Sequence, residues 1–116
     1  MSDLQKMTEA VKAFRDARNW QQFHNPKDMA LSLVLEATEV LEHFQWKNGD
    51  ELKMYVEEHK EEIGDELADV LYWVLMMSHD LGIDLQEAHA RKLEKTAKKY
   101  PIEKWSGRAG KWSEDV

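Results

Sequence analysis

Four acidic side chains interrupt two otherwise apolar stretches, and their spacing is the feature of this sequence that could do chemistry. Glu36 and Glu39 lie three residues apart in the first stretch, and Glu66 and Asp69 repeat that spacing in the second. On a helix, residues three apart share a face, with Cβ atoms roughly 5–6 Å apart. An ionised carboxylate among Leu, Val and Ala is costly unless a cation neutralises it. Because no Lys or Arg occupies the same helical positions, the sequence predicts a metal site formed by these four acids, the acidic cluster.

A ligand set made only of carboxylates selects hard ions, so we expect Mg²⁺, with Mn²⁺ as a substitute, rather than zinc or copper. Mg²⁺ in proteins usually keeps several waters and takes part of its shell from substrate phosphates. The cluster therefore indicates phosphate-ester or phosphoanhydride chemistry. The sequence has no Walker-A loop, which excludes a P-loop hydrolase. One Glu-x-x-Glu pair would most simply be a solvated helix face, but two pairs within apolar helices favour a metal.

Two further roles follow for acids in or beside the cluster. We expect a glutamate of the first pair, Glu39 before Glu36, to act as general base on water. Glu62 lies one turn before Glu66 and would orient the metal ligands from behind. A di-iron carboxylate bundle is disfavoured, because that fold supplies Glu-x-x-His motifs and no histidine here has a glutamate three residues before it.

The elements that must position these acids are helices. Ser2 with Gln5 forms a predicted capping box, and Asn25 followed by Pro26 is a typical helix start. Gly82 is a typical stop, Asp84 a typical N-cap, and the remaining boundaries follow from apolar periodicity. The pattern predicts helices over residues 2–18, 25–46, 57–81 and 84–100, a helical turn over 51–56, and an extended or disordered tail over about 102–116.

The second and third of these helices are apolar nearly all round, so they need burial on every side. Two flanking amphipathic helices cannot provide it. We therefore expect one all-α domain over residues 1–116, a four-helix-bundle type subunit that assembles through its central helices into a dimer or tetramer.

The composition excludes several kinds of site and of partner. The 116 residues carry a net charge of −7 and no cysteine. The absence of cysteine excludes disulfides, zinc–thiolate sites, iron–sulfur clusters and cysteine nucleophiles. The acidic balance argues against nucleic acid as a partner, since nucleic-acid binding needs a basic footprint. With no long apolar run and no signal peptide, we expect a cytoplasmic protein without a membrane partner.

The two acidic pairs also carry a family resemblance. Glu36-Ala-Thr-Glu39, followed after a spacer by Glu66-Leu-Ala-Asp69, matches the E-x-x-E…E-x-x-D signature of the MazG-like, all-α nucleoside triphosphate pyrophosphohydrolases. The segments RNWQQFHNPKDMALSLVLEATEVLEHFQW, EEIGDELADVLYW and KLEKTAKKYP resemble the dCTP pyrophosphatase branch, over roughly residues 10 to 101.

The resemblance implies Mg²⁺-dependent hydrolysis of a (deoxy)nucleoside triphosphate to the monophosphate and pyrophosphate. Members of this family clear surplus or noncanonical nucleotides and assemble as dimers or dimers of dimers. By the same analogy, the acidic cluster provides the Mg²⁺ ligands and the substrate is a dCTP-like or noncanonical nucleotide.

The resemblance also implies a set of substrate-binding residues: Trp20, His24, Trp46, Trp73, Lys92, Lys95, Thr96 and Tyr100. Trp20 and Trp46 flank the base, with His24 nearby and Trp73 lining the pocket. The lysines and the tyrosine meet the phosphates or close the pocket, from the same or a neighbouring subunit.

One position departs from the family pattern. Relatives often carry asparagine where this chain has Thr96, and a hydroxyl lacks the paired donor and acceptor of an amide. The preferred nucleotide depends on that contact.

Alternatives remain for both sites. The chain could be a non-catalytic helical interaction module whose carboxylates pair with a partner's basic residues, or a metal-binding bundle without turnover. Trp20 and Trp46 could instead seal the core from helix ends, as large aromatic side chains usually do.

Overall fold

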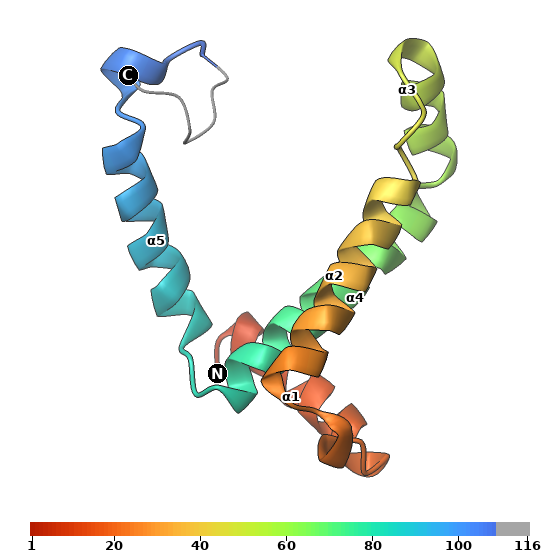
Figure 1. The fold of residues 1–116 in the computed structure, drawn as a ribbon, viewed down its shortest axis with the longest axis vertical. Coiled ribbons are helices and arrows are strands. Elements are labelled where there is room, and N and C mark those ends of the chain that lie inside the picture. Colours follow the sequence, from red (N-terminus) through yellow and green to blue (C-terminus); the bar gives the residue numbers. More distant parts are fainter. Residues whose placement is uncertain (109–116) are drawn as a thin grey trace. The chain divides into compact units, whose positions relative to one another are not determined.

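The computed structural model describes residues 1–108, and every regular element among them is helical (Figure 1). The elements are α1 (Asp3–Ala17), the 3₁₀ helix η1 (Gln21–Phe23), α2 (Pro26–Glu42), α3 (Gly49–Glu58), α4 (Lys60–Asp80), α5 (Leu85–Lys99) and α6 (Ile102–Trp105). The all-α prediction is confirmed. The chain forms two compact units, Met1–Ile83 and Asp84–Val116. In the part described, no helix is both long and apolar enough to cross a membrane.

The helix ends follow local sequence signals. Ser2 and Gln5 form the expected capping box at the start of α1. The Asn25 side chain accepts a hydrogen bond from the Asp28 N–H, and Pro26 opens α2. Gly82, with a φ of 67°, ends α4 in a Schellman arrangement in which the Ile83 N–H donates to the Ser78 carbonyl at 2.8 Å.

Three boundaries differ from the prediction. The second helix was expected to reach residue 46 but ends at Glu42, and the chain turns through residues 43–46. A full helix, α3, replaces the single turn expected over residues 51–56. The third long helix starts at Lys60 because His59, with φ −124° and ψ 25°, leaves the helical conformation between α3 and α4.

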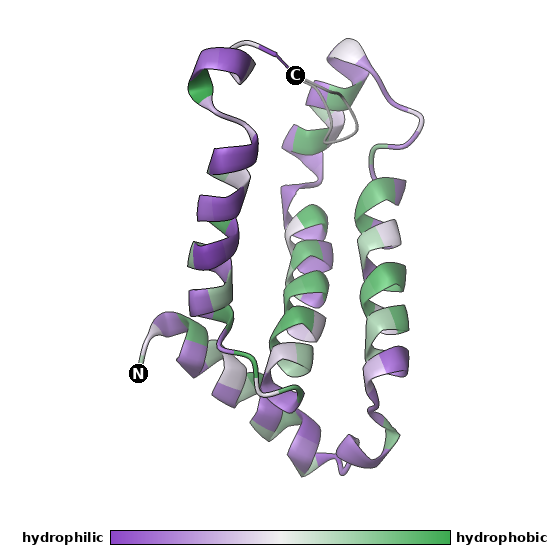
Figure 2. Ribbon diagram, turned by 60° about the vertical axis from the view of Figure 1, so that its left-hand side comes forward, coloured by the Kyte–Doolittle hydropathy of each residue, from purple (hydrophilic) through white to green (hydrophobic). Residues whose placement is uncertain are grey.

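The first unit is organised around α4. Helices α1, α2 and α3 all pack against it, and α2 and α4 run antiparallel along much of their lengths (Figure 1). The fully buried apolar residues, Met29, Leu75 and Met76, are few. Large apolar residues on α2 and α4 stay exposed, and Figure 2 shows both helices as hydrophobic over most of their turns. They are Leu31, Val34, Leu35, Leu41, Leu67 and Leu71.

One buried charge is paired where α1 meets the end of α4. Arg15 is 1% exposed, and its guanidinium donates a hydrogen bond of 2.6 Å to Asp80 Oδ2. Asp80 is the first cause of a raised pKa for Arg15, against the opposing effect of burial. This ion pair joins residues 65 positions apart and holds the end of α1 against the C-terminal end of α4.

The second unit begins with α5, for which Asp84 is the N-cap, as predicted. The segment after Pro101 was predicted to be extended or disordered, and for residues 102–105 this is wrong, since they form α6. The Trp105 ring packs edge-on against Tyr100, with centroids 4.8 Å apart, which provides the apolar contact that stabilises this single turn. The rest of that prediction falls on residues 109–116, which lie outside the described residues.

Candidate metal centre

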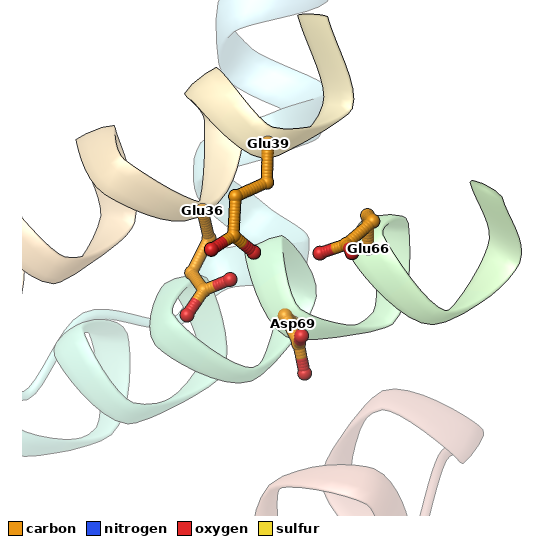
Figure 3. Close-up of side chains that lie close together, drawn as sticks. All are labelled: Glu36, Glu39, Glu66 and Asp69. Carbon is orange, nitrogen blue, oxygen red and sulfur yellow. The ribbon is translucent and has the colours of Figure 1, made fainter. Parts of the chain in front are cut away.

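The four acids come together between α2 and α4. Each offers a carboxylate oxygen, and these oxygens lie within 4.8 Å of one another. Figure 3 shows Glu36 and Glu39 projecting from α2 toward Glu66 and Asp69 on α4. The three-residue spacing puts each pair on one face of its helix, and the antiparallel packing brings the two faces together. The structure thus assembles the acidic cluster as predicted from spacing.

The cluster lacks internal neutralisation. One oxygen of Glu36 and one of Glu66 are shielded from solvent without any hydrogen-bond partner. Within residues 1–108, the basic residues in ion pairs are Arg15 and Lys60, whose partners all lie outside the cluster. Buried polar atoms without a partner are rare in folded proteins. A hard divalent cation would satisfy both orphan oxygens and the excess negative charge, so these residues fit Mg²⁺ or Mn²⁺.

The pKa values of the cluster report the same crowding. The pKa of Glu66 rises from 4.5 to about 7, first because of its hydrogen bond to the Glu39 carboxyl, then because of burial and the charges of Glu39, Asp69 and Glu36. The pKa of Glu36 is also raised, first by burial and then by Glu39. Mutual repulsion between carboxylates favours proton uptake, and a bound cation would compete with that proton.

Glu62 differs from the four acids. Its side chain is exposed, and it is not part of the group of converging carboxylate oxygens. Its role in orienting the ligands stays a prediction.

A cavity of about 380 Å³ opens beside the cluster on the side of α3. Its lining residues are Glu39, Glu42, His43, Tyr55 and Glu66. His43 Nδ1 and the Tyr55 hydroxyl are 2.6 Å apart, a hydrogen bond between α2's C-cap and α3. The spacing of four residues puts His43 on the same helix face as Glu39, but nothing in the sequence indicates Tyr55, because no periodicity within α3 predicts which residue of α2 it meets.

An aromatic group lies at the other end of α4, past Asp69. The His24 and Trp73 rings pack edge-on with centroids 5.2 Å apart. Trp73 also contacts Tyr72, and Phe14 lies against both Tyr72 and Trp20. The structure therefore brings Trp20, His24 and Trp73 to one end of the first unit, as a base pocket would require.

His24 is held on its other side by the buried ion pair. Its Nδ1 lies 3.5 Å from an Arg15 guanidinium nitrogen. Burial, followed by the charge of Arg15, lowers the pKa of His24, so this ring is neutral near pH 7.

Trp46 lies far from this aromatic group. It is 83% exposed and follows the C-terminal end of α2, whereas Trp20 precedes the N-terminal end. The 17 residues of α2 span about 25 Å at 1.5 Å per residue. One chain therefore cannot place both tryptophans on the same base, and a sandwich between them requires a second copy of the chain.

The other predicted substrate residues belong to the second unit. Lys92 and Lys95 are exposed on α5. The Thr96 hydroxyl donates to the Lys92 carbonyl at 2.9 Å, a bond within the helix, and Tyr100 contacts Trp105. Their part in binding stays a prediction.

The chain is similar to several known proteins. A sequence profile described as the MazG-like family matches residues 31–115, which include all four acids. The mouse and rat proteins named dCTP pyrophosphatase 1 are 31% and 33% identical over 116 residues, 98% of this chain. This chain spans 66% of the length of each of these two relatives. The crystal structure of a pyrophosphatase from Archaeoglobus fulgidus is similar with a TM-score of 0.81 and 35% identity, covering 87% of this chain and 94% of that one.

Proposed function

Because this chain belongs to the MazG-like family, we propose that it is an enzyme that hydrolyses (deoxy)nucleoside triphosphates to the monophosphate and pyrophosphate. The observation that carries the proposal is the acidic cluster, four converging carboxylates with two orphan oxygens and, among residues 1–108, no basic partner. Relatives named for dCTP hydrolysis and a pyrophosphatase of the same fold support it.

The four acids hold the metal, and Mg²⁺ is the ion that their chemistry favours, with Mn²⁺ as a substitute. When bound, the metal neutralises phosphate charge and lowers the pKa of a coordinated water. The residues themselves set the arrangement. Glu36 and Glu66 are the more buried ligands and anchor the site, while Glu39 and Asp69 face solvent, where a substrate arrives.

Glu39 is the proposed general base, with Glu36 beside it as the second catalytic carboxylate. Glu39 is exposed and lines the 380 Å³ cavity, so water and phosphate can reach it. It takes a proton from the attacking water as the new phosphorus–oxygen bond forms. The anhydride bond between the α- and β-phosphates breaks, and its electron pair leaves with the departing group.

Base recognition uses the aromatic end of α4. His24 and Trp73 form an edge-on pair there. Edge-on ring contacts through Tyr72 and Phe14 connect Trp73 to Trp20. Trp46 reaches the base of a neighbouring subunit. A largely aromatic surface with one imidazole suits a nucleobase such as the pyrimidine of dCTP or of a modified relative, the substrates of a house-cleaning enzyme.

Helix α5 contributes the remaining substrate contacts by analogy with the family. Lys92 and Lys95 offer positive charge for phosphates, and Thr96 and Tyr100 contact the nucleotide or close its pocket. Thr96 offers a hydroxyl where relatives often carry an amide, so the preference among dCTP-like and noncanonical nucleotides depends on that contact.

Assembly into a homo-oligomer, a dimer or tetramer, follows from two observations. Exposed apolar residues on α2 and α4 form a surface that a single chain leaves uncovered, and contiguous exposed apolar surface marks an interaction site. The two tryptophans at opposite ends of α2 also need two copies to meet.

A nucleotide panel tests the proposal. Pyrophosphate release is measured for the canonical and modified deoxynucleoside triphosphates, with Mg²⁺ and with excess chelator. We expect turnover only with metal, fastest on dCTP-like substrates, and none for Glu36→Gln. Metal-induced stabilisation without pyrophosphate release from any nucleotide would identify a metal-binding module instead, and neither response would leave an interaction module.

A further inference from the structure

The His43–Tyr55 hydrogen bond, the donor pair, lies in the wall of the cavity beside the acidic cluster and has no role in the mechanism above. His43 comes from the C-terminal end of α2 and Tyr55 from α3, and both are partly buried. The other three lining residues are glutamates. The donor pair is therefore the part of the lining that can offer a proton to a ligand.

Proton counting shows that the pair always has a donor left over. A neutral imidazole carries one N–H and a phenol one O–H, so the two groups hold two protons, and their mutual bond uses one. If the Tyr55 hydroxyl donates to His43 Nδ1, then His43 Nε2 carries the free N–H. If Nδ1–H donates to the phenol oxygen, the Tyr55 O–H is free. In either tautomer one neutral donor remains available.

The surroundings of Tyr55 show which kind of ligand that donor meets. The His59 ring stacks on Tyr55 with centroids 4.0 Å apart and planes 14° apart. The Lys47 ammonium lies 4.2 Å from the centre of the same ring. Both cannot occupy one face at such distances, so they cover both faces and no base can stack there. What remains is the hydroxyl edge, close to a positive charge, which suits an anionic oxygen.

The position of the cavity along α4 matches the far end of a nucleotide. Trp73 and the aromatic group follow Asp69 by one turn, whereas the cavity is lined by Glu66, on the opposite side of the cluster. A nucleotide with its base against Trp73 and its phosphates at the acids extends toward α3. Its last phosphates then reach the donor pair.

From this arrangement we infer that the donor pair binds the terminal phosphates of the substrate, the part that leaves as pyrophosphate. The inference rests on the proposed function. It adds Tyr55 and His43, with Lys47 behind them, as residues that distinguish a triphosphate from a monophosphate. A hydrogen bond from a neutral donor to a phosphate oxygen is charge-assisted and stronger than a neutral one.

Calorimetric titration of the full chain tests the inference, using α,β-methylene-dCTP and dCMP in the presence of Mg²⁺. Tyr55→Phe removes only the hydroxyl and keeps the ring that contacts His59 and Lys47. His43→Leu removes the imidazole donor as a second variant. The unmodified chain, titrated with the same two ligands, is the reference for both variants.

We expect Tyr55→Phe combined with His43→Leu, which removes both donors, to weaken binding of the triphosphate analogue by about 10-fold, as for loss of one charge-assisted hydrogen bond, and either change alone to weaken it less. Binding of dCMP and the melting temperature of Tyr55→Phe should match those of the unmodified chain. Unchanged triphosphate affinity, or equal losses for dCMP and the analogue, would overturn the inference while the enzyme assignment stands. If the unmodified chain binds neither nucleotide, the proposed function fails and the inference falls with it.

Discussion

Helix α4 carries one acid whose charge is compensated by a basic residue and two acids whose charges are not. Near its C-terminal end, Asp80 meets the buried Arg15 guanidinium at 2.6 Å and its charge is compensated. Near its N-terminal half, Glu66 and Asp69 face two more carboxylates, and one Glu66 oxygen has no partner at all. The first is an ion pair that joins two helices, and the second is negative charge held together against repulsion.

The contrast explains why the cluster is better interpreted as a site than as a structural feature. A chain that can supply an arginine to a carboxylate at one end of a helix supplies none to four carboxylates a few turns away. Repulsion within such an arrangement destabilises the metal-free fold, and the proposed cation would relieve it. The raised pKa of Glu66, about 7, reflects this uncompensated negative charge.

The largest expected effect separates the two sets by activity. Asp69→Asn and Glu36→Gln should each lower kcat/KM for the preferred triphosphate by more than about 100-fold, because even residues that only orient metal ligands are typically worth about 10–100-fold. Asp80→Asn, the same chemical change on the same helix, should retain much of its activity per folded molecule. Steady-state pyrophosphate release from the three variants gives the comparison, and near-normal activity of Asp69→Asn would refute the ligand assignment.

Stability should show the reverse order. Asp80→Asn should lower the free energy of unfolding by about 2–3 kcal/mol, somewhat less than the roughly 3–5 kcal/mol for a fully buried pair, because the Asp80 side chain is 20% exposed. Asp69→Asn should leave the metal-free melting temperature unchanged or raise it, since it removes repulsion. Denaturant unfolding without metal measures both. A destabilised Asp69→Asn would mean that the cluster is a structural network.

The exposed tryptophan gives a smaller effect on binding. Trp46→Ala should weaken binding of a nonhydrolysable triphosphate by about 10-fold, at the low end of base–aromatic stacking of about 1–3 kcal/mol. Its effect on the stability of the subunit fold should be slight, because the side chain is 83% exposed. If Trp46 instead seals a core, the variant loses stability and its folded fraction keeps full affinity.

The smallest effect is a pH dependence of the metal-free protein. Glu66 has a pKa of about 7 when folded and 4.5 ordinarily, so the folded state binds an extra proton between these values. That contribution to stability is complete below about pH 4.5 and lost by about pH 7, so the melting temperature without metal should fall as pH rises through this range. Glu66→Gln should flatten the dependence. An unchanged slope in Glu66→Gln would show that other groups cause it.

Periodicity and spacing predicted much of this molecule. The acidic cluster was predictable because residues three apart lie on one face of a helix, and antiparallel packing of two such helices brings the two faces together. The caps at Ser2, Asn25 and Asp84 are local, and local side-chain hydrogen bonds are visible in sequence.

Tertiary contacts account for what was missed. The break between α3 and α4 falls at His59, a few residues later than predicted, and neither proline nor glycine marks it. Tyr55 lies opposite His43 only because the chain reverses direction between α2 and α3 (Figure 1). The turn after Pro101 forms because Trp105 packs on Tyr100, a contact that the composition of this segment does not indicate. The separation of Trp20 from Trp46 was implied by the helix between them, yet the resemblance placed both at one base.

Manganese binding tests the central claim most directly, because electron paramagnetic resonance counts the free ion without any nucleotide or turnover. Titrating Mn²⁺ into the unmodified chain should remove free-ion signal in proportion to protein, and Glu61→Gln, which alters an exposed acid on the same helix, should behave identically. Asp69→Asn and Glu36→Gln should leave most of the signal free. Equal Mn²⁺ binding by all four proteins would contradict the account, since the ion would then be held somewhere other than the acidic cluster.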